Sequence, residues 1–215
     1  MYEFVTVLEQ YIVKAFEGLA FIASILFYNK YKRTALKLLP WLLGVILLVE
    51  LCGIAVYEEL GYNAFLFNIA NFLFFMFFFH VFYHFLRYRP NKKWAIVCAV
   101  VFGLIAFIDI FKFDFIKESQ LYSYFAGACL LISCIILYFI EMLRSSRVLS
   151  IRQDLMFWIS TGLLLFYVGY LPIKLTRKVF STAIDNYLIL ALVHLLLIIF
   201  MNIFFIIGLI WKRKN

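Results

Sequence analysis

Long apolar stretches, each close to the length that crosses a bilayer, dominate this chain and leave few alternatives for its fold. A transmembrane helix takes about 20 predominantly apolar residues. Seven such windows follow one another, separated by short polar segments: residues 8–28, 38–57, 63–86, 94–112, 121–143, 154–172 and 186–211. We therefore predict an all-α integral membrane protein, a seven-transmembrane helix bundle that forms a single domain over residues 1–215.

The composition supports lipid as the solvent of this fold. Hydrophobic residues make up 67% of the 215 positions, whereas soluble domains contain about 45–50%. A single core cannot hide so much apolar surface from water. The amino-terminal sequence MYEFVTVLEQ has neither a basic segment nor a small-residue cleavage site, so we expect the first apolar helix to be retained.

The distribution of basic residues predicts the orientation in the membrane. One set of alternate loops, together with the carboxyl end, carries fourteen Lys and Arg, and the other side carries five. Because cytoplasmic loops are rich in Lys and Arg, we predict an inner-membrane, multi-pass protein with its N-terminus outside and its C-terminus in the cytoplasm. The net charge of +8 then marks the inner leaflet, so the expected partner is the lipid bilayer and no nucleic acid.

The loops are too short for a soluble catalytic module, so any cytoplasmic output requires another protein. The longest connection follows Pro172 and has about 14 residues. We predict that the sixth span ends at Pro172 and that residues 173–185 form an interfacial helix rather than a lid.

A weak internal repeat raises the alternative of a transporter. GLAFIASILFY at 18–28 resembles GACLLISCIILY at 127–138, and Trp41 aligns with Trp158 when the second and sixth windows are superposed. Parallel repeats around a central inverting helix occur in small transporters of the 3+1+3 type. Hydrophobic helices also align by chance, so both the repeat and the transporter stay alternatives.

Polar residues inside the apolar windows are the functional candidates, because ionisable groups are costly in hydrocarbon. We predict that those in the middle and outer half of the bilayer converge on a pocket that is open to the outside. In that pocket Glu50 and His194 set the charge, the asparagines form hydrogen bonds and the tyrosines cap the ligand. The eight candidates are Glu17, Glu50, Asn68, Asn71, Ser160, Tyr167, Tyr170 and His194. The alternative is a set of scattered interhelical hydrogen bonds, worth about 0.6 kcal/mol each.

The other two histidines, His80 and His84, share one face near the cytoplasmic end of the third window. His80 comes nine positions after Asn71, which places the asparagines and histidines on opposite faces. No further ligands accompany the pair, as a metal site would require. We interpret it as an interfacial pair near Arg87, and we expect no metal and no cofactor.

Several activities lack the residues that they need. A retinal Schiff base needs a lysine deep in the last window, which has none before Lys212. Seven-span metal hydrolases need three histidines, an aspartate and a serine at one depth. We therefore predict no catalytic residues, although an intramembrane enzyme that uses His194 and Glu50 stays an alternative. The four cysteines lie in apolar runs and are interpreted as small packing residues.

Three stretches carry a resemblance: KYKRTALKLLPWLLGVILLVELCG, DLMFWISTGLLLFYVGYLP and MNIFFIIGLIWKRKN. They resemble uncharacterised small bacterial seven-transmembrane proteins, which are often encoded beside sensor histidine kinases that have little sensor domain of their own. The resemblance implies a sensor-kinase-type membrane partner and brings no catalytic residues. Our leading hypothesis is a sensor or receptor-like module that binds a small molecule or lipid. The alternatives are a transporter and a structural subunit of a membrane complex, and the oligomeric state stays open.

Overall fold

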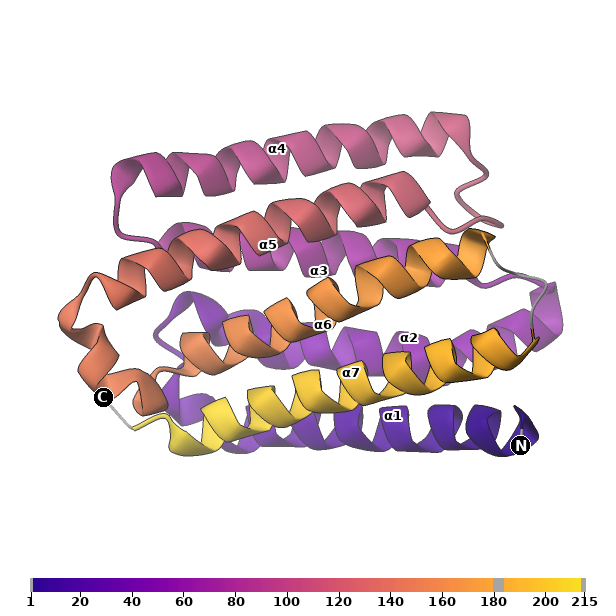
Figure 1. Ribbon diagram of the computed structural model, residues 1–215, viewed down its shortest axis with the longest axis horizontal. Coiled ribbons are helices and arrows are strands. Elements are labelled where there is room, and N and C mark those ends of the chain that lie inside the picture. The colour runs from indigo at the N-terminus through magenta and orange to yellow at the C-terminus, as the bar shows by residue number, and fades with distance from the viewer. Residues whose placement is uncertain (1, 180–183, 214–215) are drawn as a thin grey trace. The chain divides into compact units, whose positions relative to one another are not determined.

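The long elements of the chain are all helices (Figure 1). The computed structural model describes residues 2–179 and 184–213, with side chains described for 11–145, 150–176 and 189–213. Its α-helices are α1 (Tyr2–Leu26), α2 (Leu39–Leu60), α3 (Ala64–Phe85), α4 (Arg89–Lys112), α5 (Leu121–Leu143), α6 (Leu155–Val179) and α7 (Ile184–Trp211). Three short 3₁₀ helices join them: η1 (Tyr28–Lys30), η2 (Ala35–Leu38) and η3 (Ser146–Gln153). The described residues include no strand, and the predicted all-α class is confirmed.

Six helical segments are long and apolar enough to cross a membrane, which makes the chain a polytopic membrane protein by length and composition. They are Ala35–Leu60, Ala64–Phe85, Arg89–Lys112, Leu121–Leu143, Leu155–Thr176 and Ile189–Trp211, and they match the second to seventh predicted windows. The first predicted window, 8–28, falls on α1, which is helical but is not among the six. A seventh span and the orientation stay predictions.

The chain divides into two compact units, and each is considered by itself. Unit 1 comprises Met1–Lys30 and Ile151–Asn215, and unit 2 comprises Tyr31–Ser150. In unit 1, α7 packs against both α1 and α6. Figure 1 shows that α1 and α7 run in the same direction and that α6 runs in the opposite one.

Small residues let α6 and α7 approach closely, as in many membrane helix pairs. A Cβ atom added to Gly208 of α7 would lie 2.7 Å from the Cβ atom of Trp158 on α6. One added to Gly162 of α6 would lie 3.0 Å from the Cβ atom of Phe204. The Trp158 ring also stacks on the Phe204 ring at 5.9 Å between centroids. The close approach at these two positions therefore requires glycine.

A lysine fastens the end of α1 to the end of α7. The Lys30 ammonium donates to the backbone carbonyls of Leu209 at 3.2 Å and Ile210 at 2.7 Å. The last carbonyls of a helix have no intrahelical partner and carry partial negative charge, so a cation there is favourable.

Unit 2 is organised around α3, which packs against α2, α4 and α5, while α4 also packs against α5. Consecutive helices of this unit alternate in direction (Figure 1). Phenylalanines of α3 fill its core, and Phe75 lies 5.1 Å from Phe102 of α4 and 5.8 Å from Tyr124 of α5, measured between ring centroids. The phenylalanine run of the third window thus supplies the core of the unit as well as its outer surface.

The possible 3+1+3 repeat is not confirmed, because the compact units do not group the first three helices together. A repeat of that type pairs the first three helices with the last three. Here α1 belongs with α6 and α7, whereas α5 belongs with α2, α3 and α4.

The sixth helix continues beyond its predicted end. Pro172 lies inside α6, which extends to Val179. Residues 173–179 therefore continue α6 instead of starting an interfacial helix, and residues 180–183 lie outside the described part of the chain. Proline is tolerated inside membrane helices because local groups satisfy the freed backbone. The hydroxyl of Thr176 donates to the Pro172 carbonyl at 2.8 Å.

Gly61 ends α2 in a conformation that favours glycine, and this gives a first prediction. Its φ is +77°, and its N–H donates to the Tyr57 carbonyl at 2.9 Å. A Cβ atom at this position would meet nothing within 4 Å. Gly61→Ala should therefore lower the free energy of unfolding by about 1–2 kcal/mol through backbone conformation alone.

The matched control is Gly103→Ala in α4, where a Cβ atom also meets nothing within 4 Å and φ is not positive. This change should be neutral or stabilising by about 0.5–1 kcal/mol, since glycine weakens helix interiors. Both variants are compared by reversible unfolding in detergent, followed by far-UV circular dichroism. Equal changes in the free energy of unfolding for the two variants would contradict the positive φ of Gly61.

Candidate functional site

The amide of Asn68 fastens α3 to the loop between α4 and α5. Its Nδ2 atom donates to the carbonyls of Phe115 and Glu118, both at 2.9 Å, and its Oδ1 atom accepts from the N–H of Gln120 at 3.1 Å. The side chain is only 4% exposed. Asn68 therefore satisfies three backbone groups of the loop, and its amide is already engaged in the fold.

A buried carboxylate lies beside this amide at the start of α5. The Oδ2 atom of Asp109 accepts from the N–H of Ser123 at 2.7 Å, and the side chain is 3% exposed. The Ser123 hydroxyl donates to the Gln120 carbonyl at 3.2 Å. The first N–H groups of a helix lack intrahelical partners and attract negative charge. Asp109 of α4 thus caps α5 from the neighbouring helix.

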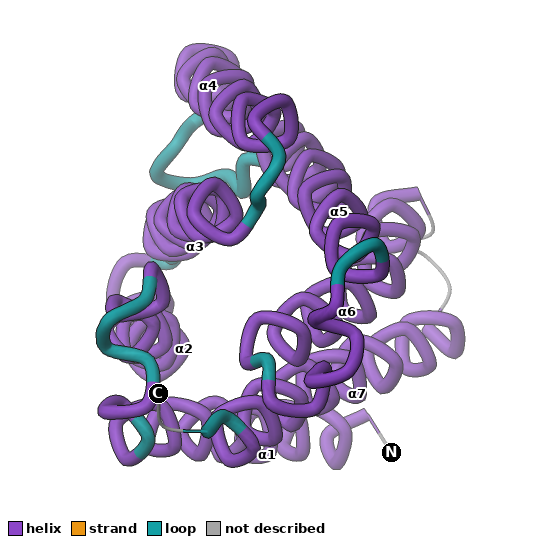
Figure 2. Tube along the Cα trace, turned by 90° about the vertical axis from the view of Figure 1, so that its left-hand side faces the viewer, coloured by secondary structure: helices purple, strands orange, loops and turns teal. Residues whose placement is uncertain are grey.

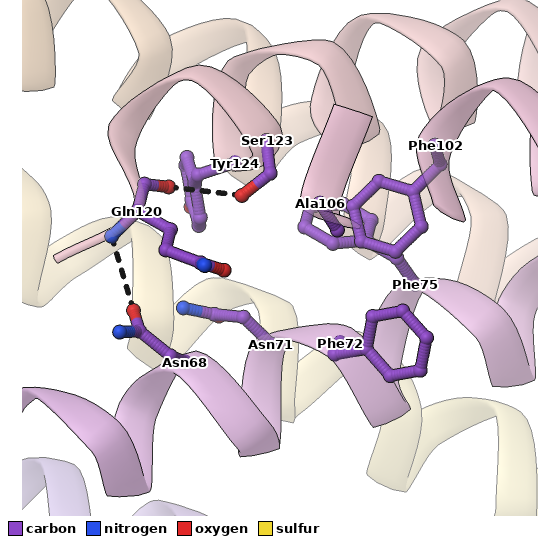
Figure 3. A pocket seen from close by; sticks show the side chains of 9 residues that line it. All are labelled: Asn68, Asn71, Phe72, Phe75, Phe102, Ala106, Gln120, Ser123 and Tyr124. Carbon is purple, nitrogen blue, oxygen red and sulfur yellow. Dashed lines mark hydrogen bonds between the residues drawn. The ribbon is translucent and has the colours of Figure 1, made fainter. Parts of the chain in front are cut away.

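A small pocket opens next to this network, between α3, α4 and α5 (Figure 3). Asn71, Gln120 and Ser123 form its polar side, and aromatic rings such as Phe75 and Phe102 form its apolar side. Its volume open to a water molecule is about 10 Å³, which is enough for one water.

The side-chain amide of Gln120 supplies a buried hydrogen-bond donor to the pocket. Nε2 of Gln120 is buried, and it has no hydrogen-bond partner among the described residues. The side chains of Gln120 and Asn71 extend into the same space (Figure 3). A donor in this position can bind a molecule that carries a hydrogen-bond acceptor, which makes the pocket the candidate functional site.

Unit 1 holds a second group of candidates, in which aromatic rings stack between α6 and α7. The rings of Tyr170 and His194 are stacked at 4.2 Å between centroids, and Phe166 stacks on Tyr170 at 5.3 Å. The Lys174 ammonium lies 5.8 Å from the centroid of the Tyr170 ring. A cation near a stacked tyrosine and histidine is a second polar locus within the apolar helices.

The remaining candidates occupy three different helices. Ser160 and Tyr167 are buried on α6, and the Ser160 hydroxyl has no hydrogen-bond partner among the described residues. Glu17 is half-buried on α1. Glu50 is half-buried on α2, one turn before Gly53, whose carbonyl accepts from Nδ2 of Asn63 at 2.9 Å.

The eight predicted residues thus divide between the two units. Unit 2 contains Glu50, Asn68 and Asn71, of which the two asparagines line one pocket. The other five belong to unit 1, where Tyr170 and His194 are in direct contact. A single pocket that unites all eight stays a prediction.

No known protein family, curated protein or solved structure matches this chain.

The sequence analysis missed a second buried carboxylate, at the other end of α5. Glu141 is 7% exposed and accepts from the N–H of Arg87 at 2.6 Å, the N–H of Tyr88 at 3.2 Å and Nδ2 of Asn91 at 2.7 Å. It holds the turn between α3 and α4. The sequence contains a feature that could have predicted this carboxylate. In the apolar run LLISCIILYFIEML, Glu141 is the lone ionisable residue apart from cysteine and tyrosine.

The histidine pair is exposed on α3, whereas Asn68 is buried. The rings of His80 and His84 lie 4.6 Å apart between centroids. Within the described residues, no three His, Cys, Asp or Glu side chains are grouped so that they could hold a metal ion. Cys98 and Cys134 are buried, Cys52 and Cys129 are exposed, and all four are free thiols.

Proposed function

We propose that this protein is a sensor-like module of the cytoplasmic membrane, which binds a small molecule or lipid and signals to a membrane or cytoplasmic partner. The observation that carries the proposal is the buried Nε2 atom of Gln120, which has no described hydrogen-bond partner and adjoins Asn71 in the pocket. A buried donor without a partner costs about 1–3 kcal/mol. A molecule with a carbonyl, carboxylate or hydroxyl acceptor recovers that cost when it binds.

The small size of the pocket explains how binding would change the protein. A space of about 10 Å³ admits one water, so a larger ligand binds only when α3 and α5 separate. The ligand then favours the separated state over the closed one. That difference in affinity is what moves a two-state equilibrium.

The route from the pocket to the far end of unit 2 is α5 itself. At its start, the N–H and carbonyl of Gln120 bond with Asn68 and Ser123. At its end, Glu141 bonds with the turn between α3 and α4. Movement of α5 at the pocket therefore reaches that turn. In the predicted orientation the turn faces the cytoplasm, where a sensor-kinase-type partner would receive the change.

The test measures what the purified protein retains in mild detergent, by native mass spectrometry of the wild type and Gln120→Met. Methionine keeps the length of the side chain and removes the donor. We expect a bound molecule in the wild type and at least a fivefold lower occupancy in the variant, which corresponds to the loss of about 1 kcal/mol. The control is Gln153→Met, the same change at a half-buried glutamine of η3 in unit 1.

Other outcomes favour other functions. Uptake of the retained molecule into proteoliposomes that is lost in Gln120→Met would favour a transporter over a sensor. Turnover of that molecule, lost in His194→Ala, would favour an intramembrane enzyme. Wild-type protein that retains nothing, together with unchanged cellular function of Gln120→Met, would favour a structural subunit.

A further inference from the structure

A basic groove lies at the end of unit 2 where α3 turns into α4, the loop between these two labels in Figure 2. Its volume is about 400 Å³, far larger than that of the pocket beside Gln120. Three basic side chains line it: His84 from the last turn of α3, Arg87 from the connecting turn and Lys92 from the first turn of α4. Three basic residues along one groove favour the binding of an anion.

No acidic side chain is among the described residues that line the groove. The Glu141 carboxylate is 7% exposed and accepts from the N–H groups of Arg87 and Tyr88. It holds the backbone of the turn, and Arg87 and Lys92 are among the residues that line the groove. A guanidinium binds phosphate oxygens through paired N–H groups, and an ammonium adds a point charge.

The surroundings of the groove indicate that the anion carries apolar chains. The half-buried Phe85 lines it together with the basic residues. Tyr88 and Trp94, on either side of Lys92 in the sequence, are exposed. Exposed Trp and Tyr at the ends of membrane helices mark the level of the lipid headgroups. The groove thus lies where a bilayer presents its phosphates.

We propose that this groove binds the headgroup phosphate of an anionic phospholipid. Arg87 and Lys92 contact the phosphate, and Phe85 lies against the first part of an acyl chain. In the predicted orientation this end of unit 2 faces the cytoplasm, and basic pockets between membrane helices on that side bind anionic headgroups. The site is separate from the pocket at Gln120 and does not depend on the proposed sensing function.

The test uses native mass spectrometry of the full chain in detergent, titrated with phosphatidylglycerol and with phosphatidylcholine of the same acyl chains. The groove variant is Arg87→Gln/Lys92→Gln. The control is Arg89→Gln/Lys93→Gln, which removes two exposed charges from the same segment at positions that do not line the groove. We expect phosphatidylglycerol to bind more tightly than phosphatidylcholine in the wild type. The groove variant should weaken it about 25-fold, or about fivefold per charge, and the control by less than twofold.

Three results would overturn the proposal. Equal losses in the two double variants would show a diffuse surface charge. Equal affinity for the two lipids would show that the groove does not select an anion. Displacement of phosphatidylglycerol by inorganic phosphate at equal concentration would make the ligand a soluble anion. If the double variant does not fold, Arg87→Gln and Lys92→Gln are compared singly with Arg89→Gln and Lys93→Gln, and the same criteria apply.

Discussion

Replacing Glu141 by alanine is expected to lower the free energy of unfolding by about 3–5 kcal/mol. The change removes the acceptor for two backbone N–H groups and the amide of Asn91. The three donor nitrogens lie 2.6 to 3.2 Å from the Glu141 carboxylate oxygens. Each buried donor that loses its partner costs about 1–3 kcal/mol, and relief of the buried charge returns part of the sum. Reversible unfolding in mixed micelles of detergent and dodecyl sulfate measures the difference.

Two further variants separate the lost hydrogen bonds from the lost charge. Glu141→Gln keeps one carbonyl acceptor and should have an intermediate effect. Glu59→Ala removes an exposed carboxylate from the last turn of α2 and should change stability by less than about 0.5 kcal/mol. A loss of under 1 kcal/mol in Glu141→Ala would show that Glu141 does not hold the turn between α3 and α4.

Substitution of Gly208 is expected to have the largest effect in unit 1. A Cβ atom there would lie 2.7 Å from the Cβ atom of Trp158 and 3.0 Å from Cδ1 of Leu155. The Trp158 Cβ atom is bonded directly to the backbone, so rotation of its side chain cannot move it away, and α6 and α7 must separate. Overpacking of this kind costs about 1–3 kcal/mol for alanine. Gly208→Leu should cost more, because three further carbons enter the same interface.

The control is Gly18→Ala on α1 in the same unit, where a Cβ atom would meet nothing within 4 Å. It should not destabilise the protein, since alanine is the better helix former. The tryptophan emission of Gly208→Leu should also shift, because Trp158 stacks on Phe204 at this interface. Similar unfolding curves for Gly208→Leu and Gly18→Ala would contradict the close approach of α6 and α7.

The sequence predicted the helices well because length and apolarity are local properties. Six predicted windows coincide with described helices of membrane-spanning length and composition. The end of α6 was predicted wrongly because Pro172 was interpreted as a stop. Whether a proline ends a helix depends on whether neighbouring groups satisfy the freed backbone, which the sequence of one helix does not reveal.

The candidate site was predicted less completely, because polar partners come from other helices. Asn68 was recognised as a buried polar residue, but its three partners lie 47 to 52 positions away in the loop between α4 and α5. Asp109 was not predicted, because its partner, the N–H of Ser123, belongs to the next helix. Gln120 was not predicted, because it lies in the polar stretch between the windows 94–112 and 121–143.

The pairing of α1 with α7 has a consequence for synthesis in the cell. About 160 residues separate the end of α1 at Leu26 from the start of α7 at Ile184. At roughly 5–20 residues per second, a ribosome takes about 8–30 s to bridge that interval. During that time the surface of α1 that packs against α7 must contact lipid or an insertase. If translation stopped before α7, α1 would lack its partner helix and become a substrate for membrane quality-control proteases.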